Sequence, residues 1–405
     1  MIFDALIIGG GPAGAITAWL LAMSGWSTVL VEKESFPRRK VCGEYISATN
    51  FPLLHKLCLV EKFLNIAGPP VREVGLFSGN YKLVAPMPDN QIPYAWGHAL
   101  GREHLDTLLL NGARAAGTII YQPCITTAIS RRKDLFFCDI ESVDGTFINT
   151  LQAHVVVAAH GSWIKGKLPS QLPKRKLRSQ DLLAFKTHFT EIELAPGLMP
   201  LLAFPGGYGG MVHTDHGRVS LSCCIRYEIL KHIRNDGQTN AGDAVLAHIK
   251  RFNDGARDSL RKAKQDGTWL SCGPISPGVR SLYENGIFKV GNAAGEAHPV
   301  VAEGISMAMQ GAHLLSELLI SNREKIMAGN SEAIGQVYEN AWRRNFVSRI
   351  RYATIFAHLA MQPLATKILL PLLHKYPRLL TTCTQLSGKI AYHDDKSKYL
   401  LNASR

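Results

Sequence analysis

The sequence predicts an α/β protein in which a parallel-sheet domain carries an inserted antiparallel-sheet domain and is followed by a helical C-terminus. The first observation is a strand–loop–helix–strand order in the opening 32 residues. Phe3 to Ile8 is a short apolar run that indicates a buried parallel strand, Ala13 to Ser24 is helix-like, and Ser27 to Glu32 is a second strand. Two parallel strands joined by a helix define a βαβ unit.

The second observation is the strand pattern farther along the chain. Residues 135–157 alternate apolar and polar side chains, and residues 180–225 contain several strand-like runs, as expected for antiparallel strands. A third observation is the chain beyond Ala333, where apolar helix-like segments are interrupted by Pro363, Pro371 and Pro377, which predicts helices that break at these prolines. The helical segments expected between these regions are Arg102–Ala116, Ala241–Phe252 and Ile305–Leu319, and a further strand is expected at Gly286–Val290.

Composition narrows the class of protein. The chain has 405 residues, of which 46% are hydrophobic and 19% charged, so it can bury a core and two or three domains or subdomains fit its length. The net charge of +13 is compatible with an anionic partner such as a dinucleotide or an anionic lipid. No nucleic-acid module and no block of five or six basic residues is found, so we expect no nucleic-acid partner.

The eight cysteines are scattered, with no C-x-x-C pair and no Cys/His cluster at zinc spacing. We therefore expect no metal site. Scattered thiols in a long chain are typical of a reducing compartment, and the first apolar stretch is interrupted by Asp4, so the sequence predicts a cytoplasmic protein without a signal peptide.

A glycine-rich motif follows the first strand directly. Gly9, Gly11 and Gly14 form G-x-G-x-x-G, with Pro12 and Ala13 opening the helix. In such a motif the first glycine allows a tight turn, the second lets the backbone approach a pyrophosphate, and the third permits close packing of helix on strand. The free N–H groups and the positive dipole end of the helix then favour phosphate. This is the fingerprint of a Rossmann-type dinucleotide-binding domain.

Glu32 and Lys33 end the second strand at the distance where a dinucleotide site places its acidic residue. A carboxylate at this position accepts hydrogen bonds from the ribose hydroxyls of the adenosine. The motif alone does not distinguish NAD from FAD. Its place at the start of the chain and the third consecutive glycine, Gly11, favour FAD.

A second segment carries a family resemblance. Gly291-Asn292-Ala293-Ala294-Gly295, then Pro299, then Gly304-Ile305 at the start of a helix resembles the aromatic flavoprotein monooxygenase superfamily, and within it the geranylgeranyl reductase-like branch. The resemblance implies a Rossmann-type FAD-binding domain in which this segment contacts the flavin. Asn292 stands where the family has an aspartate that binds the ribityl chain, and Ala302 replaces a glycine.

Three further segments match the same family. Arg102-Glu103-His104-Leu105-Asp106 resembles its R-x-x-L-D segment, whose arginine approaches the cofactor. The strand ending in His160-Gly161 resembles a strand that ends in Asp-Gly and serves both FAD and NAD(P)H, so NAD(P)H is a candidate external reductant although the aspartate is replaced. Lys40-Val41-Cys42-Gly43-Glu44 resembles the loop of the reductase-like branch that passes close to the flavin ring.

The resemblance also suggests domain boundaries. We expect a discontinuous FAD-binding domain of residues 1–70, 99–165 and 281–330, a substrate-binding domain of residues 71–98 and 166–280, and a helical C-terminal region of residues 331–405.

Candidate catalytic residues are Cys42, Glu44 and His298. Cys42 is either a small packing residue or a flavin contact. Glu44 is either a loop charge or a proton donor near the substrate, and His298, beside the expected flavin edge, is either a structural histidine or an acid/base group. The flavin itself would carry the redox chemistry.

Several activities stay open. The family resemblance favours a FAD-dependent oxidoreductase that reduces a carbon–carbon double bond in a hydrophobic prenyl or polyketide-like molecule. The alternatives are a monooxygenase that hydroxylates an aromatic or polyketide substrate and a flavin-binding protein without catalysis. Halogenation is disfavoured because the sequence lacks the W-x-W-x-I-P segment of flavin halogenases.

The tail from Arg351 to Leu380 is apolar and basic but contains no uninterrupted run long enough for a spanning helix. Its amphipathic helices either close a hydrophobic pocket or lie on a membrane surface, so peripheral membrane contact is a second expectation.

Overall fold

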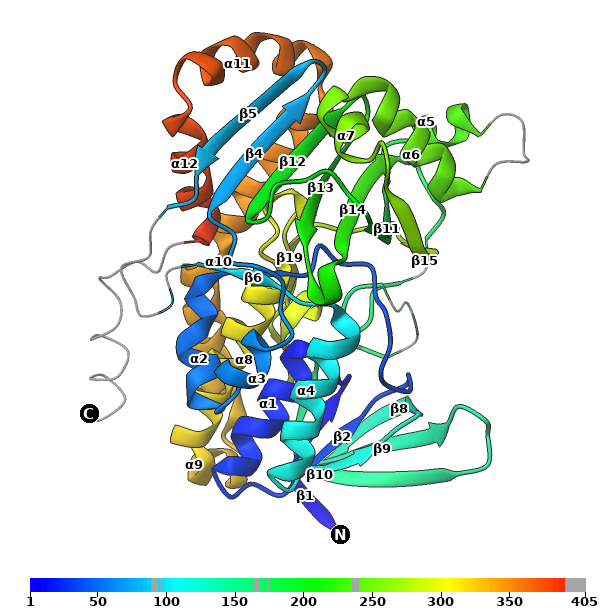
Figure 1. Ribbon diagram of the computed structural model, residues 1–405. Coiled ribbons are helices and arrows are strands. Elements are labelled where there is room, and N and C mark those ends of the chain that lie inside the picture. Colours follow the sequence, from blue (N-terminus) through cyan, green and yellow to red (C-terminus); the bar gives the residue numbers. More distant parts are fainter. Residues whose placement is uncertain are drawn as a thin grey trace.

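The computed structural model describes residues 1–389 apart from 89–93, 95, 164–165, 167, 174 and 235–239. Two large sheets dominate it (Figure 1). In the first sheet the parallel strands are ordered β18-β10-β1-β2-β7, with β17 antiparallel at one edge and β8 and β9 continuing from β10. Its strands are β1 Ile2–Ile8, β2 Thr28–Val31, β7 Ile119–Tyr121, β8 Cys124–Arg132, β9 Leu135–Ser142, β10 Ile148–Ala158, β17 Tyr283–Glu284 and β18 Ile287–Lys289.

Both faces of the first sheet are covered, which explains the continuous apolar run of β1. Successive side chains of a strand point to opposite faces. Ala5 and Ile7 belong to a core shared with the helices α1 Pro12–Met23, α4 Arg102–Ala115 and α8 Gly304–Ser321. Leu6 and Ile8 pack instead into a second core with residues of β9. The predicted βαβ unit and the three predicted helices are confirmed to within about two residues.

Short elements connect this sheet to the rest of the molecule. Two of them, the helices α2 Phe51–Lys56 and α3 Val60–Leu64, were not predicted from the sequence. The other short elements are α9 Arg323–Met327 and the paired strands β3 Tyr45–Ile46 with β6 His98–Ala99, and β16 Gly278–Val279 with β19 Gly295–Glu296.

The second sheet has the order β15-β11-β14-β13-β12-β4-β5. All neighbours are antiparallel except the β12–β4 pair. Its strands are β4 Glu73–Ser78, β5 Tyr81–Pro86, β11 Leu182–Thr190, β12 Leu198–Phe204, β13 Gly207–His213, β14 Val219–Arg226 and β15 Lys264–Cys272. The sheet thus combines residues before α4 with residues after β10, so the chain enters it twice.

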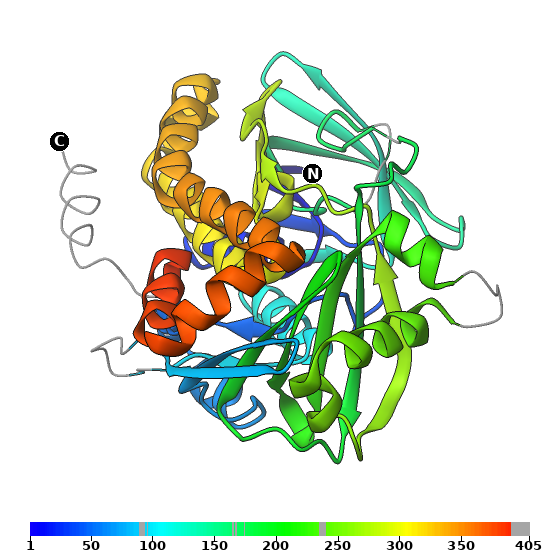
Figure 2. The ribbon, with the colours of Figure 1, turned by 90° about the horizontal axis from the view of Figure 1, so that it is seen from above.

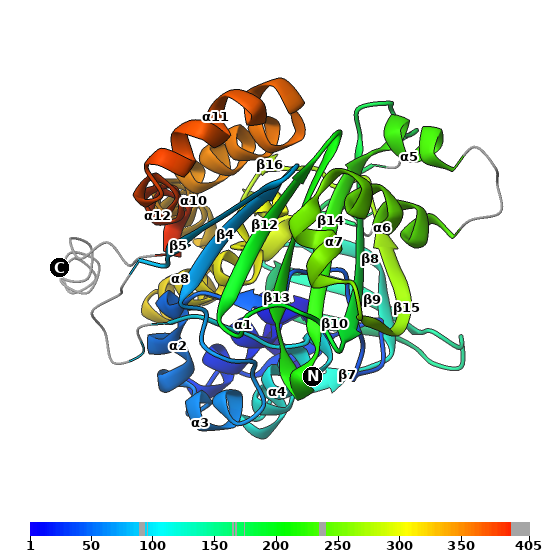
Figure 3. The ribbon, with the colours of Figure 1, turned by 45° about the horizontal axis from the view of Figure 1, so that its top comes forward.

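The second sheet also has two different faces. The helices α5 Tyr227–Ile233, α6 Ala241–Phe252 and α7 Asp254–Ser259 pack on one of them through a separate apolar core (Figure 3). The helix α10 Ser331–Met361 packs against β12 and β13, and it is followed by α11 Pro363–Lys375 and α12 Arg378–Thr384 beside β5 (Figure 2). A π-helical turn, Gln385–Lys389, ends the described chain, so residues 390–405 of the expected helical region lie outside it.

One proline expectation is wrong. Helix breaks occur at Pro363 and Pro377, but α11 continues through Pro371. Within the described residues no single helix has the length and apolar content to cross a membrane, whereas α10 and α11, bent by 102°, meet that criterion as a pair by length and composition alone.

Candidate functional site

A cavity of about 570 Å³ lies at the carboxyl ends of the parallel strands. Gly9 follows β1, Glu32 follows β2, Ala159 follows β10 and Gly291 follows β18 closely, and all four line the cavity. Parallel strands place their carboxyl ends at one edge of a sheet, and ligands of doubly wound folds bind there. Segments far apart in the sequence therefore meet at one site.

The glycine motif shapes one wall of this cavity. A side chain on Gly14 would place its Cβ 1.8 Å from the carbonyl oxygen of Gly9, so α1 can approach β1 only because residue 14 is glycine. Gly11 has the opposite environment, since among the described residues a Cβ there would meet only a guanidinium nitrogen of Arg102, at 3.8 Å. Gly11, Pro12 and Ala13 line the cavity at the N-terminus of α1, whereas Gly14 supports them from behind.

Arg102 lies beside the glycine loop. Its Nε and Nη2 each donate to the Asp106 carboxylate at 2.7 Å, one turn along α4, and Arg38 Nη1 lies 3.0 Å from the same carboxylate. The bidentate pair fixes the guanidinium plane. Arg102 and Arg38 both line the cavity next to Gly11, so the wall that faces a pyrophosphate carries fixed positive charge.

The Glu32 side of the cavity carries groups suited to an adenosine. Glu32 Oε2 accepts a hydrogen bond from the backbone N–H of Gly10 at 2.6 Å, and Oε1 accepts one from Glu34 at 2.9 Å. Each carboxylate oxygen keeps a second lone pair for a ribose hydroxyl. Lys33 lies on the rim, half-exposed and paired with Glu34. Thr126 Oγ1, also on the wall, is buried without a hydrogen-bond partner in the described part of the chain.

The second glycine segment forms the opposite wall. Gly291, Asn292, Gly304 and Ile305 line the cavity, and the N-terminus of α8 opens into it at Gly304. The backbone oxygen of Asn292 accepts from Arg280 at 2.7 Å, and no bond to its side-chain amide is found among the described residues. Ala293 is buried behind this wall and does not line the cavity.

The 40–44 loop crosses the cavity between the two sheets. Cys42 and Glu44 both line it, and Cys42 Sγ accepts a hydrogen bond from the Glu44 N–H at 3.4 Å. Glu44 adopts a positive φ of 64°, which is unusual for a residue with a side chain. Lys40 is also on the wall, and burial together with the nearby Arg102 and Arg38 charges lowers its pKa to about 8.

The structure does not support Glu44 as a proton donor. Its Oε1 accepts from Lys186 Nζ and from the Arg102 N–H at 3.0 Å, and its Oε2 accepts from His188 Nε2 at 2.7 Å. Burial by itself raises the pKa of this carboxyl, but the Lys186 charge and the His188 hydrogen bond outweigh it and hold the pKa well below its usual range. A carboxylate that stays ionised has no proton to give. Glu44 instead connects the loop to β11 of the second sheet.

His160 is held by protein groups on both ring nitrogens. Nδ1 donates to the Gly161 carbonyl oxygen at 2.9 Å, and Nε2 accepts from Ser170 Oγ at 2.9 Å. Burial lowers the pKa of His160 to about 4, so the ring is neutral. His160 and Gly161 line the cavity with a neutral surface where the family has a carboxylate.

A second cavity, of about 360 Å³, adjoins the first and is mainly apolar. Both cavities share the wall residues Val41, Cys42, Gly43, Trp163, Pro299 and Ala302. The remaining wall of the second cavity comes from the second sheet, for example Leu76, Leu201 and Met211, and from the C-terminal helices, for example Leu359, Leu369 and Leu380. The shared loop means that a molecule in the apolar cavity would meet a molecule in the first cavity at Cys42.

His298 lines neither cavity. Its ring is buried, and Nδ1 lies 3.1 Å from Tyr208 Oη, which belongs to a residue of the apolar cavity wall. Burial and then the nearby His358 lower the pKa of His298 to about 4. The ring can therefore reach a ligand of the apolar cavity only through Tyr208.

Several side chains of the site were not predicted from the sequence, among them Arg38, Thr126, Lys186, His188 and Tyr208. Lys186 and His188 stand two residues apart in a strand that begins with four apolar residues, so they point to the same face, and that pairing was the available signal. Tyr208 stands in a glycine-rich stretch of the sequence, residues 205–210, which gave no sign of a buried hydroxyl.

The fold and the cavity together define a dinucleotide-binding flavoprotein. Comparison with family models agrees, because residues 3–325 match the FAD binding domain family. The chain belongs to this family. It is therefore an enzyme of the FAD-dependent oxidoreductase class. Its FAD is expected in the first cavity, whose open Gly11, paired Arg102 and orphaned Thr126 hydroxyl fit the cofactor.

The relatives are distant but cover most of the chain. The digeranylgeranylglycerophospholipid reductase of Methanocaldococcus jannaschii is 23% identical over 91% of this chain and 88% of its own length. The menaquinone reductase of Mycobacterium tuberculosis is 23% identical over 78% of this chain and 76% of its own.

Among solved structures, the myxobacterial chondrochloren halogenase has a TM-score of 0.76 at 20% identity and covers 95% of this chain and 91% of its own. A geranylgeranyl bacteriochlorophyll reductase-like protein of Thermoplasma acidophilum has a TM-score of 0.70 at 17% identity, and the match covers 95% of this chain and 99% of that protein. These structures share the fold with this chain.

Proposed function

We propose that this flavoenzyme reduces a carbon–carbon double bond in a hydrophobic prenyl or polyketide-like molecule. The observation that carries the proposal is the apolar cavity that joins the cofactor cavity at Cys42, Gly43, Pro299 and Ala302. An apolar chain in the second cavity would reach the first at this junction. The names of the two reductase relatives support a prenylated substrate.

The protein itself would bind the cofactor and the substrate and orient them toward each other. Reduced FAD bound in the first cavity would supply the hydride for this reduction. Gly11, the Arg102–Asp106 pair and the N-termini of α1 and α8 would hold the cofactor. Apolar side chains of β12, β13 and α11 would exclude water from the substrate. Cys42 lies at the junction, so we propose that its side chain contacts the flavin and packs against the reacting double bond.

Anaerobic product analysis tests this function. The purified enzyme is reduced with dithionite and incubated with geranylgeraniol in detergent, and the product is examined by mass spectrometry. We expect a product that has gained two hydrogen atoms. An oxygenated product that forms only after air is admitted would support the monooxygenase alternative instead, and an unchanged probe in both arms would count against both.

We further propose NAD(P)H as the external reductant, on the strength of the family resemblance at His160-Gly161. Bleaching of the flavin absorbance by NADH or NADPH without air is the expected result. If only dithionite bleaches it, the electron donor is a different molecule.

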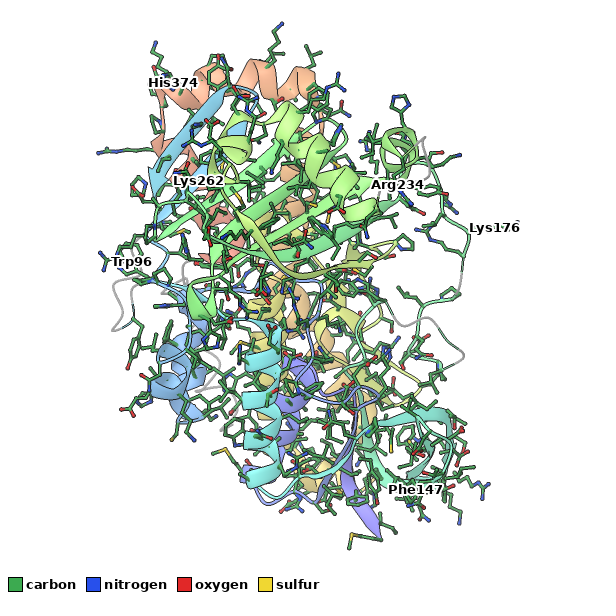
Figure 4. All side chains as sticks on the ribbon, turned by 45° about the vertical axis from the view of Figure 1, so that its right-hand side comes forward. Trp96, Phe147, Lys176, Arg234, Lys262 and His374 are labelled. Carbon is green, nitrogen blue, oxygen red and sulfur yellow. The ribbon has the colours of Figure 1, made fainter. Side chains whose placement is uncertain are left out.

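We also propose peripheral membrane contact through α11. Leu364, Ile368 and Leu372 are 70%, 66% and 48% exposed and recur every four residues, so they form one stripe on the outside of the helix. Lys367, Lys375 and Arg378 are exposed nearby, and residues 362–389 contain no Asp or Glu. Figure 4 shows His374 on this helix at the end of the molecule opposite Phe147. An apolar stripe with basic neighbours suits an anionic lipid surface.

Vesicle sedimentation tests the membrane contact. We expect the protein to pellet with phosphatidylcholine vesicles that contain phosphatidylglycerol and to release at high salt. Ile368→Ser is expected to weaken this binding about tenfold, whereas Ile148→Ser, at the exposed start of β10, leaves it unchanged. Equal binding by the wild type and Ile368→Ser would overturn the proposal.

A further inference from the structure

Three side chains form a line from the apolar cavity to solvent. Tyr208 on β13 is buried in the cavity wall, and its Oη lies 3.1 Å from Nδ1 of His298. The ring of His298 lies 6.0 Å from the ring of His358, measured between centroids, with an angle of 77° between the planes. His358 is exposed on α10. The buried phenol is therefore two imidazoles away from bulk water.

The ring nitrogens leave a path for a proton. Nδ1 of His358 donates to the Thr354 carbonyl oxygen at 2.8 Å, which leaves Nε2 to exchange protons. The two rings lie 6.0 Å apart between centroids, a spacing that one bridging water molecule could span. Imidazole is suited to such a shuttle because each ring nitrogen can give or take a proton near neutral pH.

The other titratable groups near Tyr208 do not provide this route. Cys224 and Cys223 of β14 are buried, and burial raises the pKa of the Cys224 thiol to about 12. Glu296 is also buried, and its carboxylate accepts from Ser162 Oγ and Arg280 Nη2. Burial likewise raises the pKa of Tyr208, so the phenol carries its proton at neutral pH.

We propose that Tyr208 is the proton donor of the reduction and that His298 and His358 replace its proton from solvent. This inference rests on the proposed function. Reduction of a double bond needs one hydride and one proton for its two carbons. The hydride comes from reduced FAD, and the proton leaves Tyr208 Oη as the new C–H bond forms. His298 Nδ1 then returns a proton to the phenolate, and the His298 ring takes one from His358 and solvent.

Three variants test the relay. Tyr208→Phe keeps the ring but removes the hydroxyl, and we expect turnover of geranylgeraniol by the dithionite-reduced enzyme to fall about 10²-fold or more, as for loss of a general acid. His298→Gly is expected to lose a similar factor and to regain activity with added imidazole. His358→Gln, at the surface, is expected to lose less than tenfold. The matched control is Tyr338→Phe, whose hydroxyl donates to the Lys289 backbone at 2.9 Å and lines neither cavity.

A second readout does not depend on turnover. In protein labelled with ¹⁵N-histidine, Tyr208→Phe is expected to shift the ring resonances of His298, and Tyr338→Phe is not. Flavin content checks that each variant still folds.

If the wild type reduces the probe and Tyr208→Phe does so within twofold, the relay is wrong and the reductase function stands. An unshifted His298 resonance in Tyr208→Phe, or no rescue of His298→Gly by imidazole, also overturns the relay. A wild type that leaves the probe unchanged defeats the proposed function and the relay with it.

Discussion

The two cavities of this protein differ in the side chains that line them and in the parts of the chain that supply those side chains. The cofactor cavity is rimmed by charged side chains, among them Lys33, Arg38, Arg39, Lys40 and Arg102, and every residue of its wall falls within the span that matches the FAD binding domain family. The neighbouring cavity is apolar, and part of its wall comes from α10, α11 and α12, beyond residue 325 where that match ends.

The difference in lining matches two kinds of ligand, a charged dinucleotide and an apolar substrate. A dinucleotide always brings the same phosphates and ribose, so a site for it needs fixed charge and open glycines. Under the proposed function, the apolar cavity would select its substrate mainly by shape and burial, partly through elements that lie beyond the matched span. The Glu44–Lys186–His188 cluster joins the two regions because it ties the loop of the first cavity to β11 of the second sheet.

The largest expected effect separates two glycines of the same motif. Gly14→Val forces a Cβ into the Gly9 carbonyl, so we expect loss of both FAD and the folded domain. Gly11→Val would meet only Arg102 among the described side chains but would fill the space proposed for the pyrophosphate, so we expect a folded apoprotein without flavin. Circular dichroism and flavin absorbance measure the two properties. Flavin retained by Gly11→Val would show that the cofactor lies elsewhere.

The next largest effect is expected at the Glu44–Lys186 ion pair, which joins the 40–44 loop to β11 of the second sheet. Glu44→Gln leaves the Lys186 charge buried without its anion, and we expect the free energy of unfolding to fall by about 3–5 kcal/mol. The double variant Glu44→Gln/Lys186→Met removes both charges and is expected to recover part of that loss. Urea unfolding provides the measurement. A single variant that costs under about 1 kcal/mol would contradict the role of Glu44 as an anchor.

A pair of tryptophans on α11 tests whether the apolar cavity holds substrate. Leu369 lines that cavity, and Leu364 is exposed on the outer side of the same helix. Leu369→Trp fills the cavity, and we expect turnover of geranylgeraniol to fall about 10²-fold with flavin content unchanged. Leu364→Trp, assayed in the same detergent, is expected to keep wild-type turnover. Equal activity of the two variants would place the substrate outside this cavity.

The smallest expected effect concerns pH. His160 in the wall of the first cavity and His298 behind the apolar cavity have pKa values lowered to about 4, mainly by burial, against 6.5 in an exposed histidine. Between pH 6.5 and 4 the unfolded chain binds protons that the folded chain does not, so stability falls as the pH falls through this window. His160→Gln/His298→Gln is expected to flatten the slope there by urea unfolding at several pH values. An unchanged slope would contradict the buried neutral rings.

How much could be predicted depended on how local each feature is. Gly9, Gly11 and Gly14 lie within six residues, and their spacing with the flanking strand and helix was enough to place a dinucleotide. Glu44 shows the limit of that reasoning. Its motif placed it at the cavity, but its ionisation depends on Lys186 and His188, more than 140 residues away. His298 was predicted beside the flavin edge. Its neighbours Ala297 and Pro299 line the first cavity, whereas its own ring lines neither cavity and contacts Tyr208.

The sequence by itself determined the α/β class and the strand–helix unit with its glycine motif, because hydrophobic periodicity and glycine spacing act over a few residues. The tertiary structure alone decided the charge state of Glu44, the alignment of Tyr208 with His298 and His358, and the wall of the apolar cavity. Those features arise from side chains on β11, β13, α10 and α11 that become neighbours only when the second sheet and the C-terminal helices pack together. Packing sets burial, and burial sets which groups hold their protons.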